Sequence, residues 1–544
     1  MNHAATNRLL GAPLPTPEEM ASWDDASIKE FNIPASLLME NASREAFHVI
    51  NAMLEPERRI LLIMGGGNNG GDGAALGRHL LDAGHHVLVC HARPLDSTDS
   101  TLGGHITMAR KNGVPFIPLA LSDNRLITPP EYRRIAHSPH LLVDALLGTG
   151  FSGCLREAEL AMIRFMNHMR ESVPVVSLDI PSGLDGLTGI PRPEAVRANH
   201  TVTFEAAKAG LAFPHAREYT GSVHVRRIGI PTAVHTMRPA SFYSLDPRPA
   251  AWPENKPDMH KGQGGRVVIF GGSRGLTGAP ALAALGALRS GAGLVTVACP
   301  GGIEPQIRPA FPEIMTEPLG TGEKWNIGLV PACIKAVTEL GHAAALVVGP
   351  GIGRSAETRD VIESIIKEKN RPPLILDADG LYPLGGGKGS PLLRALRGDD
   401  CITPHPGEAA HILETSAGDI QAARVASIRT LTRATRATVV LKGAGTLIAR
   451  QGAPIFIAPF TSPSLAVGGS GDVLSGIVAA LLAKVRVNYP ATPEDALRAV
   501  CLGVFMHGKA GEYLDARFPF RGALARDIAE AVPHVARNSG KQDY

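Results

Sequence analysis

The sequence predicts an α/β protein made of two doubly wound domains, each built on a parallel sheet. Three observations favour this fold. Short apolar or β-branched runs alternate with helical stretches and glycine-rich turns, which is the pattern of parallel βα units. This alternation stops over residues 234–260, where prolines gather without a sustained apolar period, and it then restarts. The glycine motifs of the two halves differ, so the halves are not repeats of one another.

Composition excludes several classes of protein. Of the 544 residues, 44% are hydrophobic and 19% charged, a balance typical of globular proteins. The formal charge of +3 is too small to indicate a nucleic-acid or membrane-surface protein. The six cysteines lie far apart without a CxxC pair, which favours a reducing compartment over a disulfide framework. No apolar run approaches the ~18–20 residues of a membrane span, and no signal-peptide pattern is present, so we expect a cytoplasmic protein.

The first half is predicted to open with two helices. Thr16 can cap a helix over Pro17–Glu30, in which Pro17 takes the first position. A second helix is predicted from about Pro34 to Ala52. The elements predicted next are strands at Ile60–Met64, His86–Cys90, Leu141–Leu147 and Val173–Leu178, a helix near Glu157–Met169, and strands in HTVTF and GSVHVRRIGIP.

The segment Gly65–Gly73, GGGNNGGDG, lies between a predicted strand and a predicted helix. Six glycines in nine residues allow positive φ angles and a close approach of the backbone to a ligand. The helix N-terminus behind them offers N–H groups to an anion. A flexible connector is the alternative interpretation. The two asparagines and the aspartate at its tip favour a binding role.

Two further motifs follow predicted strands of the first half. Gly148–Gly153, GTGFSG, has the GxGxxG pattern of a phosphate-binding turn, which is weak evidence alone, and the nearest acid, Asp179, lies about one βα unit onward. Asp144 lies within an apolar strand, where an unpaired carboxylate is costly to bury. It therefore needs a cation or several hydrogen-bond donors, and a structural hydrogen-bond network fits it equally well.

Oxygen-bearing side chains are expected to meet at the carboxyl ends of these strands, where ligands bind in open α/β sheets. Asp179 and Ser182 lie in SLDIPSG, at the end of a strand. Asn69, Asp144 and Ser182 would offer oxygen ligands with a single formal charge. Such a set suits a weakly charged cation better than zinc or a redox metal.

The motifs GGGNNGGDG, VDALLGTGFSG and SLDIPSG, with LLMENAS upstream, resemble the NAD(P)H-hydrate epimerase family. The resemblance implies a Rossmann-like domain over residues 1–233, a potassium ion held by Asn69, Asp144 and Ser182, and a catalytic Asp179. It makes Lys208 a candidate catalytic or phosphate contact, although a solvated surface lysine fits that position at least as well. The residues implied to contact the hydrated nucleotide are Asn68, Asn69, Gly70, Gly71, Asp72, Gly148, Thr149, Gly150, Phe151, Ser152, Gly153, Cys154 and Asp179.

The second half carries a glycine-rich helix start. Gly468–Gly476 reads GGSGDVLSG and precedes a helix that is apolar on one face. Gly469, Ser470 and Gly471 then lie at the helix N-terminus, where consecutive N–H groups bind anions. Asp472 lies in the first turn, where a carboxylate can take the proton of a hydroxyl that attacks phosphate. Complementing the helix dipole, worth about 0.3–1 kcal/mol, is the alternative role.

Two other segments of the second half offer contacts. Lys442–Thr446, KGAGT, follows an apolar run; its glycines permit a close backbone approach and Lys442 supplies a point charge for phosphate. His405 lies between two prolines, which hold an extended loop and favour a contact, although a lone loop histidine is often incidental. The G-x-x-x-x-G-K-[ST] pattern is absent from the sequence, which excludes a P-loop enzyme.

The motifs KGQGGRVVIFGGS, VVGPGIG, LDADGL, TPHPGE, LKGAGT and GGSGDVLSG resemble the ribokinase-like superfamily, and within it the NAD(P)H-hydrate dehydratases. The resemblance implies a ribokinase-like domain over residues 261–544, separated from the first by the 234–260 linker. The family motif is closer to ATGGTGDV, whereas this chain has AVGGSGDV. Val467 and Ser470 each replace a threonine of that motif: Ser470 keeps the hydroxyl group, and Val467 loses it. The implied contacts are Ala279, Gly351, His405 and Asp472 with the hydrated nucleotide, and Lys442, Gly443, Ala444, Gly445, Thr446 and Gly471 with the adenine nucleotide.

The order of the two halves resembles bifunctional enzymes that repair hydrated NADH and NADPH. The resemblance implies that the first domain interconverts the R and S hydrates. The second would dehydrate the S-hydrate with ADP as phosphoryl donor and Mg²⁺ at its site, giving NAD(P)H, AMP and phosphate. Small-molecule substrates and a homo-oligomer are expected, with neither nucleic acid nor membrane as partner. The alternative is a kinase of a vitamin-type alcohol fused to a non-catalytic nucleotide-binding module.

Overall fold

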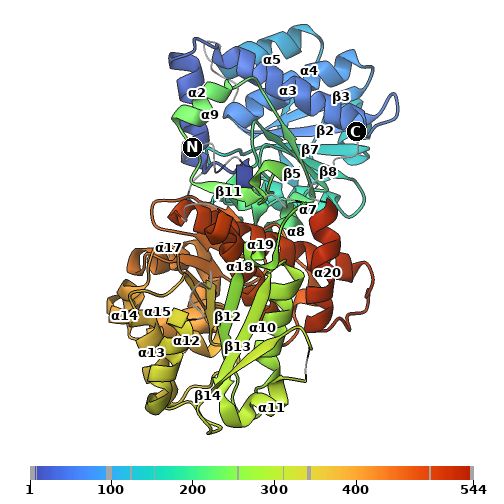
Figure 1. Cartoon of the computed structure of the whole chain (residues 1–544). Helices are drawn as coiled ribbons and strands as arrows, with labels where there is room; N and C mark the ends of the chain where they lie inside the picture. The colour runs from blue at the N-terminus through green and yellow to red at the C-terminus, as the bar shows by residue number, and fades with distance from the viewer. Residues whose placement is uncertain are drawn as a thin grey trace. The chain divides into compact units, whose positions relative to one another are not determined.

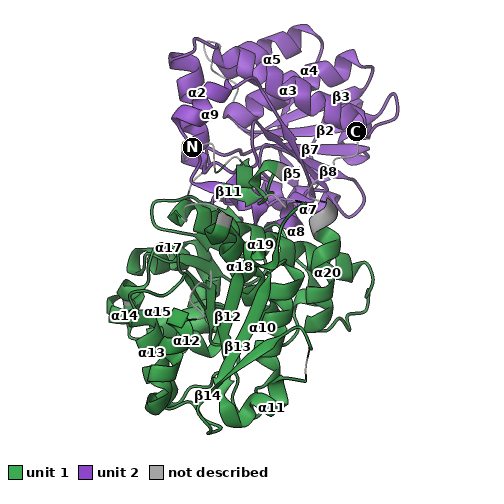
Figure 2. Ribbon diagram, in the orientation of Figure 1, with its two compact units in different colours: residues 1–12, 243–544 green, residues 13–242 purple. Residues whose placement is uncertain are grey.

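The computed structural model describes residue 7 and residues 9–92, 101–122, 125–151, 153–253, 257–309, 311–339, 345–488 and 492–538. The chain forms two compact units (Figure 2). Residues 13–242 form the N-terminal unit, and residues 1–12 together with 243–544 form the C-terminal unit. Among the described residues, no helix combines the length and apolarity that crossing a membrane requires. Ser152, predicted to contact a nucleotide, lies outside the described residues.

The N-terminal unit contains a seven-stranded parallel sheet in the order β10-β9-β8-β7-β2-β3-β4. Its central strands are buried on both faces, as expected when βα connections place helices on both sides. The prediction of a parallel α/β domain is therefore confirmed. The strands are β2 (Arg59–Met64), β3 (His86–His91), β4 (Phe116–Pro118), β7 (Leu141–Ala145), β8 (Val175–Leu178), β9 (His200–Phe204) and β10 (Ser222–Arg226), with β5 (Leu121–Ser122) and β6 (Arg125–Leu126) as a separate pair.

Helices cover both faces of this sheet. Helices α3, α4 and α5 lie side by side in Figure 1, and apolar side chains of α7 pack with residues of β2 and β7 in one core cluster. Thr16 caps α2 as predicted: Glu19 N donates to Thr16 Oγ1, and the Glu19 carboxylate accepts from Thr16 N. The helices are α2 (Pro17–Lys29), α3 (Ala35–Asn51), α4 (Asn68–Asp82), α5 (Thr101–Lys111), α6 (Arg133–His137), α7 (Glu157–Met169), α8 (Arg217–Thr220) and α9 (Thr232–Met237).

The glycine-rich segment Gly65–Gly73 differs from the prediction, because α4 already begins at Asn68 within it. None of its glycines has a positive φ. They are needed for close packing: a Cβ at Gly70 would lie 2.1 Å from the Gly65 carbonyl oxygen, and one at Gly73 would lie 2.7 Å from Ala145 Cβ. The glycines therefore bring the first turn of α4 against β2 and β7, at the strand ends.

The C-terminal unit contains an eleven-stranded mixed sheet in the order β1-β11-β20-β19-β18-β17-β16-β15-β12-β13-β14. The seven strands from β18 to β14 are parallel, whereas β18, β19 and β20 are antiparallel neighbours. The predicted doubly wound sheet is confirmed, with a mixed edge that was not predicted. The strands are β1 (Gly11–Pro13), β11 (Phe242–Leu245), β12 (Arg266–Phe270), β13 (Leu294–Pro300), β14 (Met315–Leu319), β15 (Ala345–Val348), β16 (Leu374–Leu376), β17 (Cys401–Ile402), β18 (Thr438–Leu441), β19 (Leu447–Ala449) and β20 (Ile455–Ile457).

Two glycines hold α10 and α18 close together in this unit. A Cβ at Gly286 of α10 would lie 2.4 Å from the Val473 carbonyl oxygen, and one at Gly476 of α18 would lie 1.9 Å from the Ala283 carbonyl oxygen. This contact fixes the start of α18, where Asp472 lies. The helices are α10 (Gly278–Arg289), α11 (Glu304–Ile307), α12 (Val330–Glu339), α13 (Ala356–Lys367), α14 (Pro391–Ala395), α15 (Pro406–Leu413), α16 (Ala417–Ala422), α17 (Arg424–Ala434), α18 (Ser470–Asn488), α19 (Pro493–Asp515) and α20 (Ala525–Asn538).

The chain passes between the units at two places, between residues 12 and 13 and between residues 242 and 243. The second place lies within the predicted linker but does not span it. The segment 234–260 contains most of α9 and all of β11, and the change of unit falls between Phe242 and Tyr243. Strand β1 pairs with β11 at the sheet edge, where Asp246 N donates to Leu10 O over 2.9 Å. Both strands are too short to show a period in the sequence, so the predicted boundaries 1–233, 234–260 and 261–544 assign them to other parts of the chain.

Candidate functional sites

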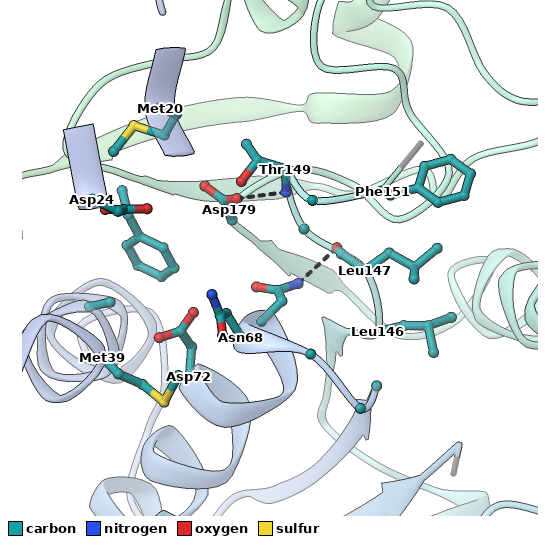
Figure 3. Close-up of a pocket in the computed structure, with 18 of the residues that line it drawn as sticks. Met20, Asp24, Met39, Asn68, Asp72, Leu146, Leu147, Thr149, Phe151 and Asp179 are labelled. Atoms are coloured by element: carbon teal, nitrogen blue, oxygen red, sulfur yellow. Dashed lines mark hydrogen bonds between the residues drawn. The ribbon is translucent and has the colours of Figure 1, made fainter. Parts of the chain in front are cut away.

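The N-terminal unit contains a cavity of about 690 Å³ at the carboxyl ends of its central strands (Figure 3). Helices α2, α3 and α4, the loop after β7 and the loop after β8 all contribute to its lining. Open α/β sheets bind ligands at this edge. The predicted nucleotide contacts that line it are Asn68, Asn69, Asp72, Gly148, Thr149, Gly150, Phe151, Cys154 and Asp179.

Three other predicted contacts do not line this cavity within the described residues: Gly70, Gly71 and Gly153. Gly70 packs against the Gly65 carbonyl, and a Cβ at Gly71 would lie 2.5 Å from Met39 Sδ. Their role is to let α4 approach its neighbours. Conversely, Gly65, Gly66 and Gly67 line the cavity although they were not singled out as contacts.

Asp144 is fully buried at the end of β7 and accepts four hydrogen bonds. Ser177 Oγ donates over 2.7 Å, Ser182 Oγ over 2.5 Å, Ser182 N over 2.9 Å and Leu146 N over 3.2 Å. Burial raises the pKa of Asp144, and the hydrogen bonds from Ser182, Ser177 and Leu146 lower it again in part. The donor network that was one interpretation of this residue is therefore present. A role as a cation ligand stays a prediction.

Asn69 and Ser182 meet at the backbone of Leu147. Asn69 Nδ2 donates to Leu147 O over 2.8 Å, and Leu147 N donates to Ser182 Oγ over 2.8 Å. Among the described residues, the buried Asn69 Oδ1 atom has no hydrogen-bond partner. A buried polar atom of this kind calls for an additional donor or a cation. The structure thus brings the three predicted ligands together, and one of them offers an unused oxygen.

Asp179 and Lys208 form an ion pair at the cavity wall. Lys208 Nζ contacts Asp179 Oδ1 and also donates to Thr203 Oγ1 and Phe204 O, each over 3.0 Å. Lys208 is only 1% exposed, so the interpretation as a solvated surface lysine is wrong. Asp179 accepts from Thr149 N and has a φ of +63°, a strained conformation for a residue with a side chain.

Two more carboxyl groups face the cavity. Asp24 comes from α2 and was not identified from the sequence, whereas Asp72 comes from α4, just beyond its first turn (Figure 3). Burial raises the pKa of Asp24 to about 6, with Lys208 lowering it and Asp179 raising it. Burial also raises the pKa of Asp72 well above its usual range, helped by Asp179 and Asp24. Both carboxyls are therefore more easily protonated than ordinary aspartates.

The predicted site of the C-terminal unit centres on the start of α18. This helix begins at Ser470, Gly469 before it has a φ of +90°, and Asp472 lies in its first turn. The Ser470 hydroxyl lies 3.1 Å from His507 Nε2 of α19. Burial lowers the pKa of His507 to about 4, so its ring is neutral at pH 7. His507 is a supporting residue that nothing in the sequence indicated.

Lys442 faces this helix start but is already ion-paired. Its Nζ lies 2.7 Å from Asp377 Oδ1 and 3.6 Å from Glu408 Oε2. Asp377 also accepts from Thr403 Oγ1 over 2.7 Å. A Cβ at Gly471 would lie 3.3 Å from Lys442 Nζ, so lysine and helix start are neighbours. Lys442 is therefore held in position by Asp377, which sequence analysis noted only as part of the LDADGL turn.

Asp472 lies among other acidic groups. Its pKa is raised to about 7, chiefly by burial and then by the charge of Asp377; Lys442 lowers it, and Asp379 and Glu408 raise it by smaller amounts. A carboxyl with such a pKa changes its charge near neutral pH, as a general base must. Dipole complementation would lower the pKa of an acid at a helix N-terminus, so it acts against the effect of burial on Asp472. The catalytic role of Asp472 stays a prediction.

Other predicted contacts of the C-terminal unit lie in turns and at helix starts. Gly443 and Gly445 have φ angles of +138° and +63°, which fits the predicted need for glycine in KGAGT, and Arg424 donates to the carbonyls of Lys442 and Gly445. His405 caps α15 through hydrogen bonds from Gly407 N and Glu408 N. A Cβ at Gly351 would lie 3.3 Å from Ala279 Cβ, so these two predicted contacts are adjacent.

No cluster of three or more His, Cys, Asp or Glu side chains in the described part of the chain has the arrangement of a metal site. Asp377, Asp379, Glu408 and Asp472 nevertheless influence one another electrostatically around Lys442. Mg²⁺ usually binds through one or two carboxylates together with substrate phosphates. The residues present fit a metal ion that arrives with a nucleotide rather than one held by the protein alone.

Comparison with known proteins finds the same two halves. A family model described as "NAD(P)H-hydrate dehydratase" matches residues 267–534, and one described as "YjeF-related protein N-terminus" matches residues 35–210. A "Bifunctional NAD(P)H-hydrate repair enzyme Nnr" of Moorella thermoacetica is 34% identical over 537 residues, covering 96% of this chain and 97% of that protein. The enzyme of the same description from Escherichia coli is 33% identical and covers 92% and 89% of the two chains.

A solved structure resembles the second half. It is the ADP/ATP-dependent NAD(P)H-hydrate dehydratase of Bacillus subtilis, co-crystallised with ATP/Mg²⁺. It is 26% identical, with a TM-score of 0.44, and the match covers 54% of this chain and 95% of that one.

Proposed function

The chain belongs to the family of bifunctional NAD(P)H-hydrate repair enzymes, and we propose that its two units divide this repair between them. The protein epimerises hydrated NAD(P)H and dehydrates it in an ADP- or ATP-dependent reaction. The N-terminal unit performs the epimerisation and the C-terminal unit the dehydration. The observation that carries this conclusion is the full-length similarity, in which both halves align with bifunctional enzymes in one stretch.

The epimerase site is the cavity of the N-terminal unit. Its volume of about 690 Å³ lies within the range of pockets that hold small molecules and cofactors. Asn68, Asp72 and Thr149 line it beside Asp179, which we assign as a catalytic residue. The strained backbone of Asp179 and its ion pair with Lys208 fix the carboxylate against the cavity.

The dehydratase site uses Asp472 as its base. The ring hydroxyl of the S-hydrate is a poor leaving group, so ADP first transfers its terminal phosphoryl group to that oxygen and leaves as AMP. Asp472 takes the hydroxyl proton. The ring nitrogen then supplies the electron pair that expels phosphate, and the neighbouring carbon loses a proton to restore the double bond. A pKa of about 7 places Asp472 between its acidic and basic forms near neutral pH.

The phosphate groups of ADP would lie at the start of α18. Gly469 and Gly471 offer backbone N–H groups there, whereas Ser470 N already donates to Val467 O over 3.2 Å, and Lys442 supplies the positive charge. Mg²⁺ bound with ADP would neutralise charge on the transferred phosphoryl group. Lys442 is already held by Asp377 and Glu408, so it needs no rearrangement to face the phosphates.

The proposed function is tested with separated R and S hydrates of NADH and NADPH. With ADP and Mg²⁺, we expect the protein to restore the near-ultraviolet absorbance of reduced nicotinamide and to release AMP and phosphate in equal amounts. Without ADP, only the ratio of R to S should change. A stable phosphorylated product without reduced nicotinamide would instead indicate a small-molecule kinase.

Epimerisation is expected to depend on potassium held by Asn69, Asp144 and Ser182. Removing the free amide oxygen by Asn69→Ala should lower the epimerisation rate at least about 10-fold, because one oxygen ligand is lost. Replacing potassium with tetramethylammonium should have the same effect on the wild type. The measurement is the approach of pure R-hydrate to the equilibrium ratio.

Two controls accompany the potassium test. ADP-dependent dehydration of the S-hydrate should be unchanged in Asn69→Ala, since its site lies in the other unit. Asn167→Ala removes an amide on α7 that bonds Ala195 and lies outside the cavity lining, and it should leave potassium dependence intact. Epimerisation that is indifferent to potassium would make Asp144 solely a hydrogen-bond acceptor.

A further inference from the structure

Three carboxyl groups surround one part of the epimerase cavity, and they differ in how they are compensated. Figure 3 shows Asp24, Asp72 and Asp179 approaching from α2, from α4 and from the end of β8. Of these three carboxyls, Lys208 contacts only that of Asp179, although its charge also acts on the other two. Among the described residues no hydrogen-bond donor or cation contacts the Asp24 carboxyl. One carboxyl is therefore ion-paired and one is uncompensated.

This difference gives Asp24 and Asp179 unlike surroundings. Asp179 contacts the Lys208 ammonium and accepts a hydrogen bond from Thr149 N over 3.1 Å. The pKa of Asp24 is raised to about 6, chiefly by burial. The charge of Lys208 lowers this pKa, and the charges of Asp179 and Glu205 raise it. Asp24 in turn raises the pKa of Asp72. Two carboxyl groups in such unlike environments can divide the roles of general acid and general base between them.

We propose that Asp24 is the general acid of epimerisation and that Asp179 is its base. The inference rests on the proposed epimerase function and adds a catalytic group to it. Asp24 lies before residue 35, where the match to the N-terminal family begins, so that match does not assign it. Asp72 is 8% exposed, whereas Asp24 is less buried and presents its carboxyl to the cavity.

The two groups account for a balanced reaction. The hydrated ring carbon carries a hydroxyl next to the ring nitrogen. Asp24 donates its proton to this oxygen, the C–O bond breaks, and water leaves while the nitrogen lone pair forms a C=N bond. Water then adds to the opposite face, the C=N electrons return to nitrogen, and Asp179 takes the released proton. One proton enters and one leaves, nothing is oxidised or reduced, and in the reverse direction the two carboxyls exchange roles.

The inference is tested in the full chain with Asp24→Asn. We expect the epimerisation rate from pure R-hydrate to fall about 10²–10⁴-fold, the usual effect of losing one acid–base partner. The wild-type rate should decrease as the pH rises past about 6, because Asp24 loses its proton, and Asp24→Asn should lack this decrease. Asp24→Ala should regain part of its activity with added acetic acid, which can replace the missing carboxyl.

The matched control is Asp25→Asn. Asp25 is the next residue of α2, and it forms an ion pair with Lys29 on the exposed side of the helix. It should epimerise at the wild-type rate, which shows that a substitution at this place in α2 leaves the N-terminal unit folded. All variants should dehydrate the S-hydrate normally, because that site lies in the other unit. Unchanged epimerisation in Asp24→Asn, with an active wild type, would overturn the inference alone. A wild type that does not accelerate epimerisation would contradict the proposed function as well.

A second measurement is independent of the reaction. A carboxyl whose folded-state pKa is raised lowers the stability of the folded chain as the pH rises from its ordinary pKa of 3.8 to its folded-state pKa of about 6, and the loss persists above that pH. Asp24→Asn should therefore melt at a higher temperature than the wild type at pH 8, and at the same temperature near pH 4. A pH-independent difference would show that the Asp24 carboxyl does not ionise in this pH range, and would also overturn the inference.

Discussion

Replacing Asp472 with asparagine is expected to lower ADP-dependent dehydration about 10²–10⁴-fold while leaving ADP binding nearly unchanged. Asparagine keeps the shape of the side chain in the first turn of α18 but cannot take the hydroxyl proton. Because the base must be ionised, wild-type turnover should increase as the pH rises through about 7. The measurements are single-turnover dehydration of the S-hydrate and calorimetric titration with ADP.

Two comparisons make the Asp472 result specific. Asp360→Asn changes an exposed aspartate of α13 outside the site and should behave as the wild type. Epimerisation should be normal in both variants. If Asp472→Asn retained turnover within a few-fold of the wild type, Asp472 would serve only to complement the helix dipole, and another group would have to accept the proton.

The second large effect is expected from Lys208→Met. The side chain is 1% exposed and contacts Asp179, Thr203 and Phe204. Its removal leaves the Asp179 carboxylate without its cation, so we expect the free energy of unfolding to fall by about 3–5 kcal/mol. Epimerisation should fall about 10²-fold or more, because the Asp179 carboxylate would lose the cation that holds it in position as the base.

A double variant separates the two consequences for Lys208. Lys208→Met combined with Asp179→Asn removes both partners, so no uncompensated charge remains. The double variant should regain most of the lost free energy of unfolding, measured by urea unfolding followed by tryptophan fluorescence. Its epimerisation activity should stay lost. A double variant that does not regain stability would mean that Lys208 stabilises the unit chiefly through Thr203 and the Phe204 carbonyl.

Sequence patterns predicted the elements whose signals are local. The cap at Thr16, the helix over residues 157–169 and the strand at Ile60–Met64 each depend on neighbouring residues, and each is present in the structure. Strands β1 and β11 could not be predicted, because three or four residues carry no period and their pairing joins positions more than 200 residues apart.

The candidate sites were predictable where a motif lies at the end of a strand or at the start of a helix. Asn69, Asp144, Asp179 and Asp472 were identified in this way. Asp24 was not, because a lone acid on an amphipathic helix is usually solvated. The burial of Lys208 was also hidden, since it depends on Asp179 and Thr203, which other strands bring to it. Side chains that meet only after folding leave no local signal.

The pairing of β1 with β11 has a consequence for the order of folding during synthesis. Gly11 leaves the ribosome long before Ser244, and at about 5–20 residues per second its partner strand follows roughly 10–50 s later. Residues 13–242 are continuous in sequence and can fold within that time. Strand β1 can join the sheet of the C-terminal unit only after β11 has been synthesised. The nascent chain therefore completes its epimerase before it can close the edge of its dehydratase.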